Sequence, residues 1–316
     1  MVNAPRVHGG PGAQGAALHD FSTNANACGP CPHALAAVQG ADATRYPDPA
    51  STALRAALAA LHGVDAARIV PAASGSEFIF RITAWAASRG AGTVALPAHA
   101  YGDYAAAARA WDLAPVPAGA DLHWAADPSS PLGVGDPLSR SAAGVQVLDR
   151  AYEPLRLDGA PPPAAALDRV WQLWTPNKAL GLTGVRAAYA IAPVGADTAG
   201  LEALAPSWPI GAHGAAMLQA WCSQPVQDWL AASLLVLRDW KARQLALCTS
   251  LGWQSLPSDA NFFVVGPVGA DVVAALQAQG IQLRDCSSFG LPGQVRLSVQ
   301  PPASQAALQQ AVEAMQ

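Results

Sequence analysis

The chain has 316 residues, of which 52% are hydrophobic and 13% charged, against a usual charged share of about 25%. This composition excludes an intrinsically disordered protein, because such chains lack the apolar surface that offsets the entropy lost on folding. The net charge is −4 and the basic residues are scattered singly, which argues against a nucleic-acid partner. The longest nearly uncharged helical stretch, 229–237, is far shorter than the roughly 20 residues that cross a membrane.

The N-terminus and the cysteines indicate the compartment. The first residues contain no apolar core of a signal peptide, and five cysteines fit a reducing environment better than a disulfide framework. Cys28 and Cys31 have C-x-x-C spacing, but no second pair and no helix with paired histidines accompanies them, so no metal site is expected. We expect a cytoplasmic protein with no nucleic-acid or membrane partner, and the role of Cys28 and Cys31 stays open.

The chain order of patterns predicts two domains after an arm. Residues 1–40 are loop-rich and predict an N-terminal arm that packs with the small domain or a partner subunit. Residues 41–210 alternate between helical spacing and short apolar runs. Helices are expected at 51–61, 77–87 and 104–111, the first with Ser51 as N-cap, and strands at 68–72, 93–96, 144–148, 170–174 and 187–191. This alternation is typical of a large α/β domain with a mostly parallel sheet sandwiched by helices.

The pattern changes after Pro206 and Pro209. Strands at 261–265, 281–284 and 295–299 alternate with helices at 270–278 and 303–315, which predicts a smaller α+β domain over residues 211–316. Two helices precede these elements, at about 212–222 and 226–247. The expected core face of the longer helix carries Trp229, Leu230, Leu234, Leu237, Leu245 and Leu247.

Lysine is rare in this chain, since only Lys178 and Lys241 occur among the 18 basic residues. An amine can lose its proton and attack a carbonyl, whereas a guanidinium stays protonated, so a lysine kept in an apolar stretch suggests chemistry that arginine cannot perform. Lys241 is interpreted as a residue on the solvated face of a helix. Lys178 follows a buried strand, where partial desolvation favours the neutral amine, and it is the expected reactive group.

The segment around Lys178 carries a recognisable pattern. Residues 175–186 read TPNKALGLTGVR, which resembles the S-x-[ST]-K-x-x-G-L-x-G-x-R signature of the fold-type I pyridoxal-phosphate (PLP) enzymes, the class I/II aminotransferase family. The resemblance implies an α/β fold-type I enzyme with a PLP cofactor. It makes Lys178 the catalytic lysine that bonds the cofactor, Arg186 a bidentate clamp on the cofactor phosphate, and Thr175 a neighbouring cofactor-binding residue.

Other segments match the family in the same order. Residues 74–77 read SGSE and resemble the family's phosphate cup, in which N–H groups at a helix N-terminus hold the anion. The resemblance places Gly75, Ser76 and Glu77 in that cup. Residues 97–104 resemble the P-x-x-x-Y-x-x-Y segment, so Tyr101 is expected to stack on the pyridine ring.

Residues 148–152 resemble the family's D-E-A-Y segment. By this resemblance Asp149 keeps the pyridine nitrogen protonated, which makes the ring an electron sink, and Tyr152 reaches the ring hydroxyl. Residues 45–48 read RYPD, the segment whose tyrosine reaches the cofactor phosphate of a partner subunit. Tyr46 therefore implies a homodimer with active sites at its interface.

The chain departs from the family pattern at two positions. Residues 127–133 read DPSSPLG in place of N-P-N-N-P-T-G, so Ser130 replaces an asparagine that donates to the ring hydroxyl. A serine hydroxyl donates one hydrogen bond but is shorter. Asn177 likewise replaces the Ser or Thr that precedes the lysine.

Two subgroups compete for the substrate. The HGG opening at His8, the DFS segment with Asn24, and residues 284–296 resemble threonine-phosphate decarboxylase of cobalamin biosynthesis, while histidinol-phosphate aminotransferases share the Lys, Arg and Asp signatures. The resemblance implies that Arg296 holds the substrate carboxylate, with Arg284, His8 and Asn24 near the carboxylate or phosphate.

The expected function is therefore a PLP-dependent decarboxylase that converts L-threonine O-3-phosphate, a small phosphorylated amino acid, to (R)-1-amino-2-propanol phosphate. The first alternative is a PLP-dependent aminotransferase of the histidinol-phosphate type. The second, motivated by Ser130 and the altered lysine segment, is a non-catalytic binding protein on the same fold.

Overall fold

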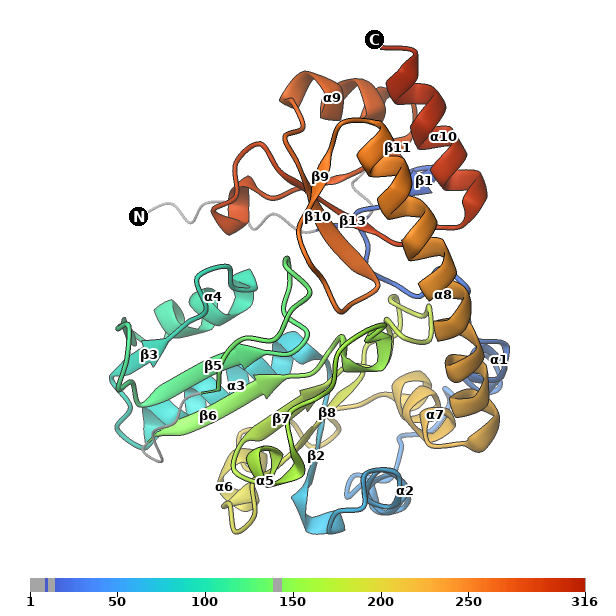
Figure 1. The fold of residues 1–316 in the computed structure, drawn as a ribbon. Coiled ribbons are helices and arrows are strands. Elements are labelled where there is room, and N and C mark those ends of the chain that lie inside the picture. Colours follow the sequence, from blue (N-terminus) through green and yellow to red (C-terminus); the bar gives the residue numbers. More distant parts are fainter. Residues whose placement is uncertain (1–8, 11–14, 139–143, 316) are drawn as a thin grey trace.

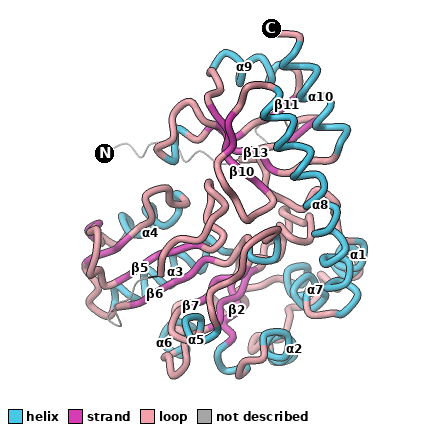
Figure 2. The backbone as a smooth tube through the Cα atoms, in the orientation of Figure 1, coloured by secondary structure: helices cyan, strands magenta, loops and turns pink. Residues whose placement is uncertain are grey.

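The computed structural model describes residues 9–10, 15–138 and 144–315. Figure 1 shows a larger and a smaller part, with the long helix α8 (Gln224–Ser250) running from one to the other. A seven-stranded sheet forms the centre of the larger part and a four-stranded sheet that of the smaller part. Helices pack on both faces of the larger sheet and on one side of the smaller sheet (Figure 2). The predicted α/β class is confirmed.

The large sheet has the order β2-β8-β7-β6-β5-β3-β4. Only β8 runs antiparallel to its neighbours, β2 and β7, so the predicted mostly parallel sheet is confirmed. β5, which pairs with β6 along its whole length, was not predicted, because its apolar residues are interrupted by His123. The strands are β2 (Ile69–Ala72), β3 (Thr93–Ala95), β4 (Ala114–Pro115), β5 (Leu122–Ala126), β6 (Val145–Asp149), β7 (Trp171–Trp174) and β8 (Ala188–Ile191).

Two helical layers cover this sheet. Successive side chains of a strand point to opposite faces, so Ala188 and Ala190 of β8 pack in one core with α3 (Gly75–Ser88) and α4 (Gly102–Ala110). Tyr189 and Ile191 pack in another with α2 (Thr52–His62) and α7 (Ala212–Trp221). The short helices α5 (Ala164–Leu167) and α6 (Thr198–Glu202) lie in the connections that follow β6 and β8.

Helix α2 begins where the sequence predicts, but the expected capping group is wrong. Ser51 occupies the N-cap position with a left-handed backbone (φ 51°), and its side chain makes no capping hydrogen bond. Asp48 caps the helix instead, since its Oδ2 accepts from the Thr52 N–H at 2.8 Å. The left-handed backbone of Ser51 turns its hydroxyl away from the free N–H groups.

The smaller part is built on an antiparallel sheet in the order β12-β13-β10-β9. The predicted strand at 281–284 is divided between two sheets: β11 (Ile281–Gln282) pairs with β1 (His19–Asp20), and β12 (Arg284–Asp285) pairs with β13. The other elements are β9 (Gln254–Ser255), β10 (Phe262–Gly266), α9 (Ala270–Ala278), β13 (Val295–Ser298) and α10 (Pro302–Glu313).

The N-terminal segment contains more regular structure than the predicted loops. β1 lies parallel to β11 of the smaller part, with His19 opposite Ile281. α1 (Pro32–Gln39) follows and contacts α7 and α8, and proline at its first position needs no hydrogen-bond partner for a backbone N–H. The boundaries of the arm and the two domains at residues 40 and 210 stay a prediction.

Helix α8 buries a stripe that repeats every three or four residues. The interpretation of Lys241 as a solvated residue is wrong, because Lys241 lies on this stripe and is 9% exposed. Its Nζ donates to the backbone oxygens of Ser258 and Ala260, which compensates the buried charge. None of the described helices combines the length and apolar character needed to span a bilayer. The buried stripe consists of Val226, Leu230, Ser233, Leu237, Lys241, Gln244 and Cys248.

Candidate active site

A cavity of about 520 Å³ lies at the edge where β5, β6 and β7 end. Because the carboxyl ends of parallel strands lie at the same edge of a sheet, loops far apart in the sequence meet there. The smaller part and the N-terminal segment supply the remaining wall. The sequence-predicted residues that line this cavity are Asn24, Gly75, Ser76, Tyr101, Ser130, Asp149, Tyr152, Thr175, Lys178, Arg186, Arg284 and Arg296.

Three predicted site residues are not among those that line the cavity. His8 lies outside the described residues. Glu77 was expected in the phosphate cup, but its Oε2 accepts from the Ala73 N–H at 3.0 Å and its carboxylate pairs with Arg81, so it closes the first turn of α3. Tyr46 is 77% exposed and stacks on Trp208 with 4.3 Å between the ring centroids.

The N-terminus of α3 is built to receive an anion. Ser74 Oγ accepts from the Glu77 N–H at 3.0 Å, which leaves the N–H groups of Gly75 and Ser76 without a partner among the described residues. A Cβ at position 75 would lie 2.9 Å from Thr175 Cγ2, so glycine allows the close approach of helix and loop. The Thr175 hydroxyl is buried without a partner in the described part of the chain.

Arg186 adds a positive charge beside this helix end. Its side chain is exposed and has no hydrogen bond or ion pair with any described residue, although it lines the cavity. A guanidinium with free donors beside unpaired backbone N–H groups provides a site for a phosphate.

Asp149 lies at the end of β6, and burial raises the pKa of its carboxyl group. Its Oδ2 accepts from the Tyr104 hydroxyl at 2.7 Å, and its Oδ1 accepts from the Ala151 N–H at 2.8 Å. Burial, together with this carboxylate, raises the pKa of Tyr104 well above its usual value, so the phenol remains a donor. A carboxylate held in this way is suited to bind a cationic ring N–H.

Lys178 lies in the turn that follows β7, and its Nζ is 5.2 Å from the centroid of the Tyr152 ring. The Tyr152 hydroxyl accepts from Asn24 Nδ2 at 3.3 Å, and Asn24 Oδ1 is buried without a partner among the described residues. Burial raises the pKa of Tyr101, on the cavity wall, to about 12. The Lys178 amine, the Tyr152 phenol and the Asn24 amide thus line the same cavity.

Arg284 and Arg296 lie opposite each other on β12 and β13. Each is less than a tenth exposed, and burial lowers the pKa of both guanidinium groups. Arg296 donates to Ser130 Oγ at 2.7 Å and to the Ser22 carbonyl at 2.8 Å, and it has no carboxylate within ion-pair distance in the described residues. A buried cation without an acidic partner calls for an anionic ligand.

Sequence reasoning missed several cavity residues. Tyr104, the second tyrosine of the P-x-x-x-Y-x-x-Y segment, holds Asp149, and its place one helical turn after Tyr101 was the available signal. Asp136 also lines the cavity, and burial raises its pKa to about 6. His99 Nδ1 hydrogen-bonds the Phe289 carbonyl at 2.7 Å across the opening. No motif pointed to Asp136 or His99.

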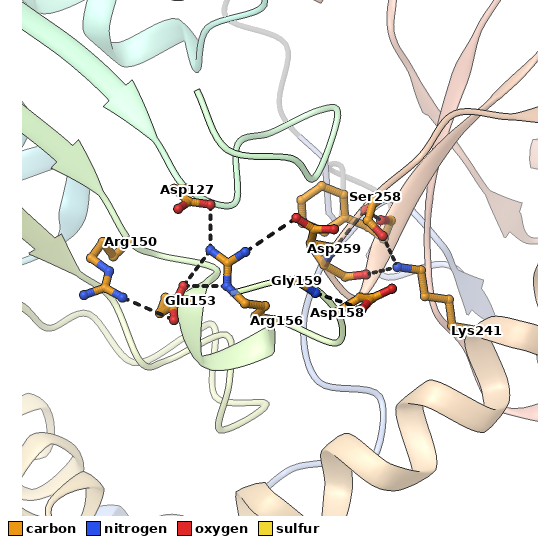
Figure 3. Close-up of polar contacts among 11 residues, drawn as sticks. Asp127, Arg150, Glu153, Arg156, Asp158, Gly159, Lys241, Ser258 and Asp259 are labelled. Atoms are coloured by element: carbon orange, nitrogen blue, oxygen red, sulfur yellow. Dashed lines mark hydrogen bonds and ion pairs between the residues drawn. The ribbon is translucent and has the colours of Figure 1, made fainter. Parts of the chain in front are cut away.

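Behind the cavity, a charged network joins the two parts of the molecule (Figure 3). Arg156 pairs with Asp127 at 2.6 Å, with Glu153 at 2.8 Å and with Asp259 of the smaller part at 3.6 Å. Asp127 begins the loop that carries Ser130, and Glu153 follows Tyr152. Lys241 of α8 donates hydrogen bonds to the carbonyls of the neighbouring segment 258–260.

Replacing Arg156 with glutamine is expected to lower the free energy of unfolding by about 3 kcal/mol, because it leaves the buried Asp127 carboxylate without its ionic partner, while Glu153 keeps its pair with Arg150. Urea denaturation followed by circular dichroism measures the change. The control is Arg243→Gln, which breaks an exposed pair with Asp239 and should cost less than about 1 kcal/mol. Equal losses in the two variants would contradict the assignment.

Comparisons with known proteins agree with this geometry. The profile of the aminotransferase class I and II family matches residues 147–315. The histidinol-phosphate aminotransferase of Erythrobacter litoralis is 32% identical over 91% of this chain and 88% of its own length. The structure of histidinol-phosphate aminotransferase from Sinorhizobium meliloti, in complex with pyridoxal-5'-phosphate, superposes with a TM-score of 0.81 at 22% identity, covering 96% of this chain and 93% of that one.

A decarboxylase has a similar fold. The L-threonine-O-3-phosphate decarboxylase of Porphyromonas gingivalis superposes with a TM-score of 0.70 at 22% identity, covering 90% of this chain and 93% of that one. The predicted fold-type I architecture is therefore confirmed. The family match over more than half of the chain, together with the Erythrobacter relative, shows that this protein belongs to the class I and II aminotransferases.

Proposed function

We propose that this enzyme is a PLP-dependent aminotransferase that acts on a small phosphorylated amine of the histidinol-phosphate type. One observation carries the proposal: the Lys178 amine, the Asp149 carboxylate and the anion cup at the N-terminus of α3 meet in one cavity. The curated relatives named histidinol-phosphate aminotransferase support this substrate class over the decarboxylase that the sequence motifs favoured.

The cavity offers a group for each functional part of PLP. The Asp149 carboxylate suits the pyridine nitrogen, and the Lys178 amine suits the aldehyde. Bound PLP supplies an aldehyde that bonds amines and a protonated ring that accepts electrons from the α-carbon. The groups for the phosphate are the N–H groups of Gly75 and Ser76, the Thr175 hydroxyl and the Arg186 guanidinium; those for the ring are Tyr101, Ser130 and Tyr152.

Lys178, Asp149 and Tyr101 each have a separate role in the proposed reaction. Lys178 has a primary amine, which would bond the cofactor aldehyde and, when free, could accept a proton from the substrate α-carbon. Asp149 stays ionised against the ring N–H, with the Tyr104 hydroxyl bonded to its Oδ2. Tyr101 is a wall of the cavity that excludes water from the ring face.

The anionic end of the substrate is assigned to the smaller part. Arg296 and Arg284 lie side by side, and Arg296 Nε is buried without a partner among the described residues. Asn24 Oδ1 is also buried without a partner among the described residues. Arg296 and Asn24 can therefore each form a further hydrogen bond with a ligand. His8 keeps its expected role near the same anions as a prediction.

Replacing Arg296 with glutamine is expected to lower kcat/KM for the phosphorylated substrate by about 10³-fold, since a buried cation that meets an anion is worth several kcal/mol. Steady-state kinetics measure this effect, and most of it should appear in KM. The absorbance of the bound cofactor should stay unchanged. A kcat/KM within about threefold of wild type would remove Arg296 from the substrate site.

The decarboxylase stays as a second candidate, because two adjacent buried arginines suit a substrate with both a carboxylate and a phosphate. L-Threonine O-3-phosphate carries both anions. The orientation in which the site holds the α-carbon, with its bond to the carboxylate or its bond to hydrogen placed for cleavage, would decide between the two reactions.

The test incubates the purified enzyme and PLP separately with histidinol phosphate plus an oxo-acid acceptor and with L-threonine O-3-phosphate. We expect amino transfer to the oxo acid from the first substrate and little carbon dioxide from the second. Carbon dioxide without amino transfer would favour the decarboxylase. A protein that stays colourless after PLP is added would instead be a binding protein on this fold.

We also propose a homodimer, because Tyr46 is exposed and is not among the residues that line its own chain's cavity. Its expected place is at the cofactor phosphate of the partner subunit. Sedimentation should give twice the mass of one chain, and Tyr46→Phe should weaken cofactor binding by about 10-fold, the value of one hydrogen bond to a charged group.

A further inference from the structure

The turn that carries Lys178 is hydrogen-bonded to the N-terminal segment 26–31. Three successive carbonyl groups of this turn accept hydrogen bonds from that segment: Lys178 from the Asn26 N–H at 2.9 Å, Ala179 from Asn26 Nδ2 at 3.0 Å, and Leu180 from the Cys31 N–H at 2.8 Å. In Figure 1 this blue segment runs between β1 and α1, beside α8.

Asn26 is buried, at 3% exposure, and every polar atom of its amide is used. Nδ2 donates to Ala179 O and, at 2.8 Å, to Ser233 Oγ on α8. The Ser233 hydroxyl donates its hydrogen to the Leu230 carbonyl, so its oxygen accepts the hydrogen bond from Asn26. Asn26 Oδ1 accepts from the Cys28 N–H at 3.0 Å. This amide has no bonding capacity left for a ligand.

The two backbones approach so closely that a Cβ on either glycine would be crowded. A Cβ at Gly29 would lie 3.1 Å from Gly181 Cα, and a Cβ at Gly181, whose φ is +66°, would lie 3.0 Å from Gly29 Cα. The segment CGPC therefore makes a close backbone contact with the lysine turn.

We propose that Asn26 is a positioning residue for Lys178, which ties the lysine turn to the N-terminal segment and to α8. The proposal rests on the proposed function, since it assumes that Lys178 bonds the cofactor. Asn26 is absent from the cavity wall and touches neither the lysine side chain nor the space for the substrate.

The geometry explains how Asn26 acts at a distance. Hydrogen bonds hold the carbonyls of residues 178–180, and the Lys178 side chain of the same turn lines the cavity, with its Nζ 5.2 Å from the centroid of the Tyr152 ring. Without the Asn26 side-chain amide the turn loses the bond at Ala179 O and, with it, the link to Ser233 of α8, and keeps the backbone bonds from the Asn26 and Cys31 N–H groups. A displacement of about 1 Å at the reacting amine is enough to cost 10²-fold in rate.

The test compares wild type with Asn26→Asp, which keeps the shape and the Oδ1 acceptor but replaces the double donor. The matched control is Gln305→Glu on α10, because the Gln305 amide is also buried and its Nε2 also donates to two acceptors, Trp240 O and Gln300 O. Both variants should lower Tm by on the order of 5 °C.

Only Asn26→Asp should alter the lysine. We expect the pH midpoint of the bound cofactor's absorbance to shift by about one unit, the borohydride-trapped fraction of Lys178 to fall, and kcat to fall about 10²-fold with little change in KM. If Asn26→Asp does not fold, Asn26→Ser, which removes both Nδ2 bonds without adding charge, should give the same pattern. The same absorbance midpoint and trapped fraction as in Gln305→Glu would overturn the proposal.

The outcomes also separate this proposal from the proposed function. If borohydride and peptide mapping leave Lys178 unmodified in the wild-type protein, the proposed function fails and the inference about Asn26 fails with it. If wild type is modified at Lys178 and Asn26→Asp behaves as the control does, only the inference about Asn26 is overturned.

Discussion

Replacing Lys178 with arginine is expected to lower turnover by about 10⁴-fold or more, because a guanidinium stays protonated and neither bonds an aldehyde nor accepts a proton. The charge at position 178 is kept, so the loss reports on the chemistry of the amine. The cavity and the anion cup are left in place, and PLP should still bind, although without the absorbance of a lysine-bonded cofactor.

Steady-state rates and absorbance spectra of purified Lys178→Arg measure this prediction. Lys178→Ala provides the complementary variant, since a small added amine such as methylamine should restore part of the lost activity in the space left by the side chain. Turnover by Lys178→Arg within about 10-fold of wild type would remove Lys178 from the reaction and, with it, the proposed function.

Replacing Asp149 with asparagine is expected to lower kcat by about 10³-fold, because the ring nitrogen loses the fixed negative charge that keeps it protonated. The charge is lost while the shape of the side chain is preserved. Burial raises the pKa of Asp149, so its carboxyl group takes up a proton at a higher pH than an exposed aspartate does.

The sign of the pH dependence follows from this shift. Above its raised pKa the Asp149 carboxyl is ionised and binds the cationic ring; as the pH falls through that pKa, the group is protonated and the attraction is lost. Cofactor affinity in wild type should therefore weaken on acidification over a range above that of an exposed aspartate, and Asp149→Asn should lack this dependence.

Fluorescence titration with PLP at several pH values measures that dependence. Tyr104→Phe is the matched control, because it removes the hydrogen bond to Asp149 Oδ2 but keeps the carboxylate. Its activity should fall by only about 10-fold. An Asp149→Asn variant with the pH profile and kcat of wild type would show that this carboxylate does not hold the ring.

The family and the fold class were predictable from local patterns. Lys178 and Arg186 stand eight residues apart in one loop, and Gly181 between them has a left-handed backbone (φ +66°), so a short segment carried the decisive signal. The strands β7 and β8 were visible as apolar runs because they are buried on both faces, and β6 has a buried centre at Val147 and Leu148. The decarboxylase was favoured by a few motif residues, whereas similarity over the whole chain supports the aminotransferase.

Other features depend on contacts between distant segments. Lys241 lies on the same heptad-like stripe as Leu230 and Leu237, which was a signal of burial, but its carbonyl partners are supplied by a loop that the helix spacing does not reveal. Glu77 matches the cup motif, yet its carboxylate reaches Arg81 one turn along α3.

The sequence by itself determined the family and the alternation of strands and helices, and it predicted the reactive lysine and the anion cup, because each of these signals arises within a few consecutive residues or from a periodic pattern. Only the tertiary structure decided that Tyr104 holds Asp149, that Arg156 joins the two parts, and that Asn26 lies beneath Lys178. These contacts join residues separated by tens to more than a hundred positions. Hydrogen bonds and ion pairs between such residues depend on how helices and strands pack. The spacing of residue types along a short stretch of sequence does not show which distant segments pack together.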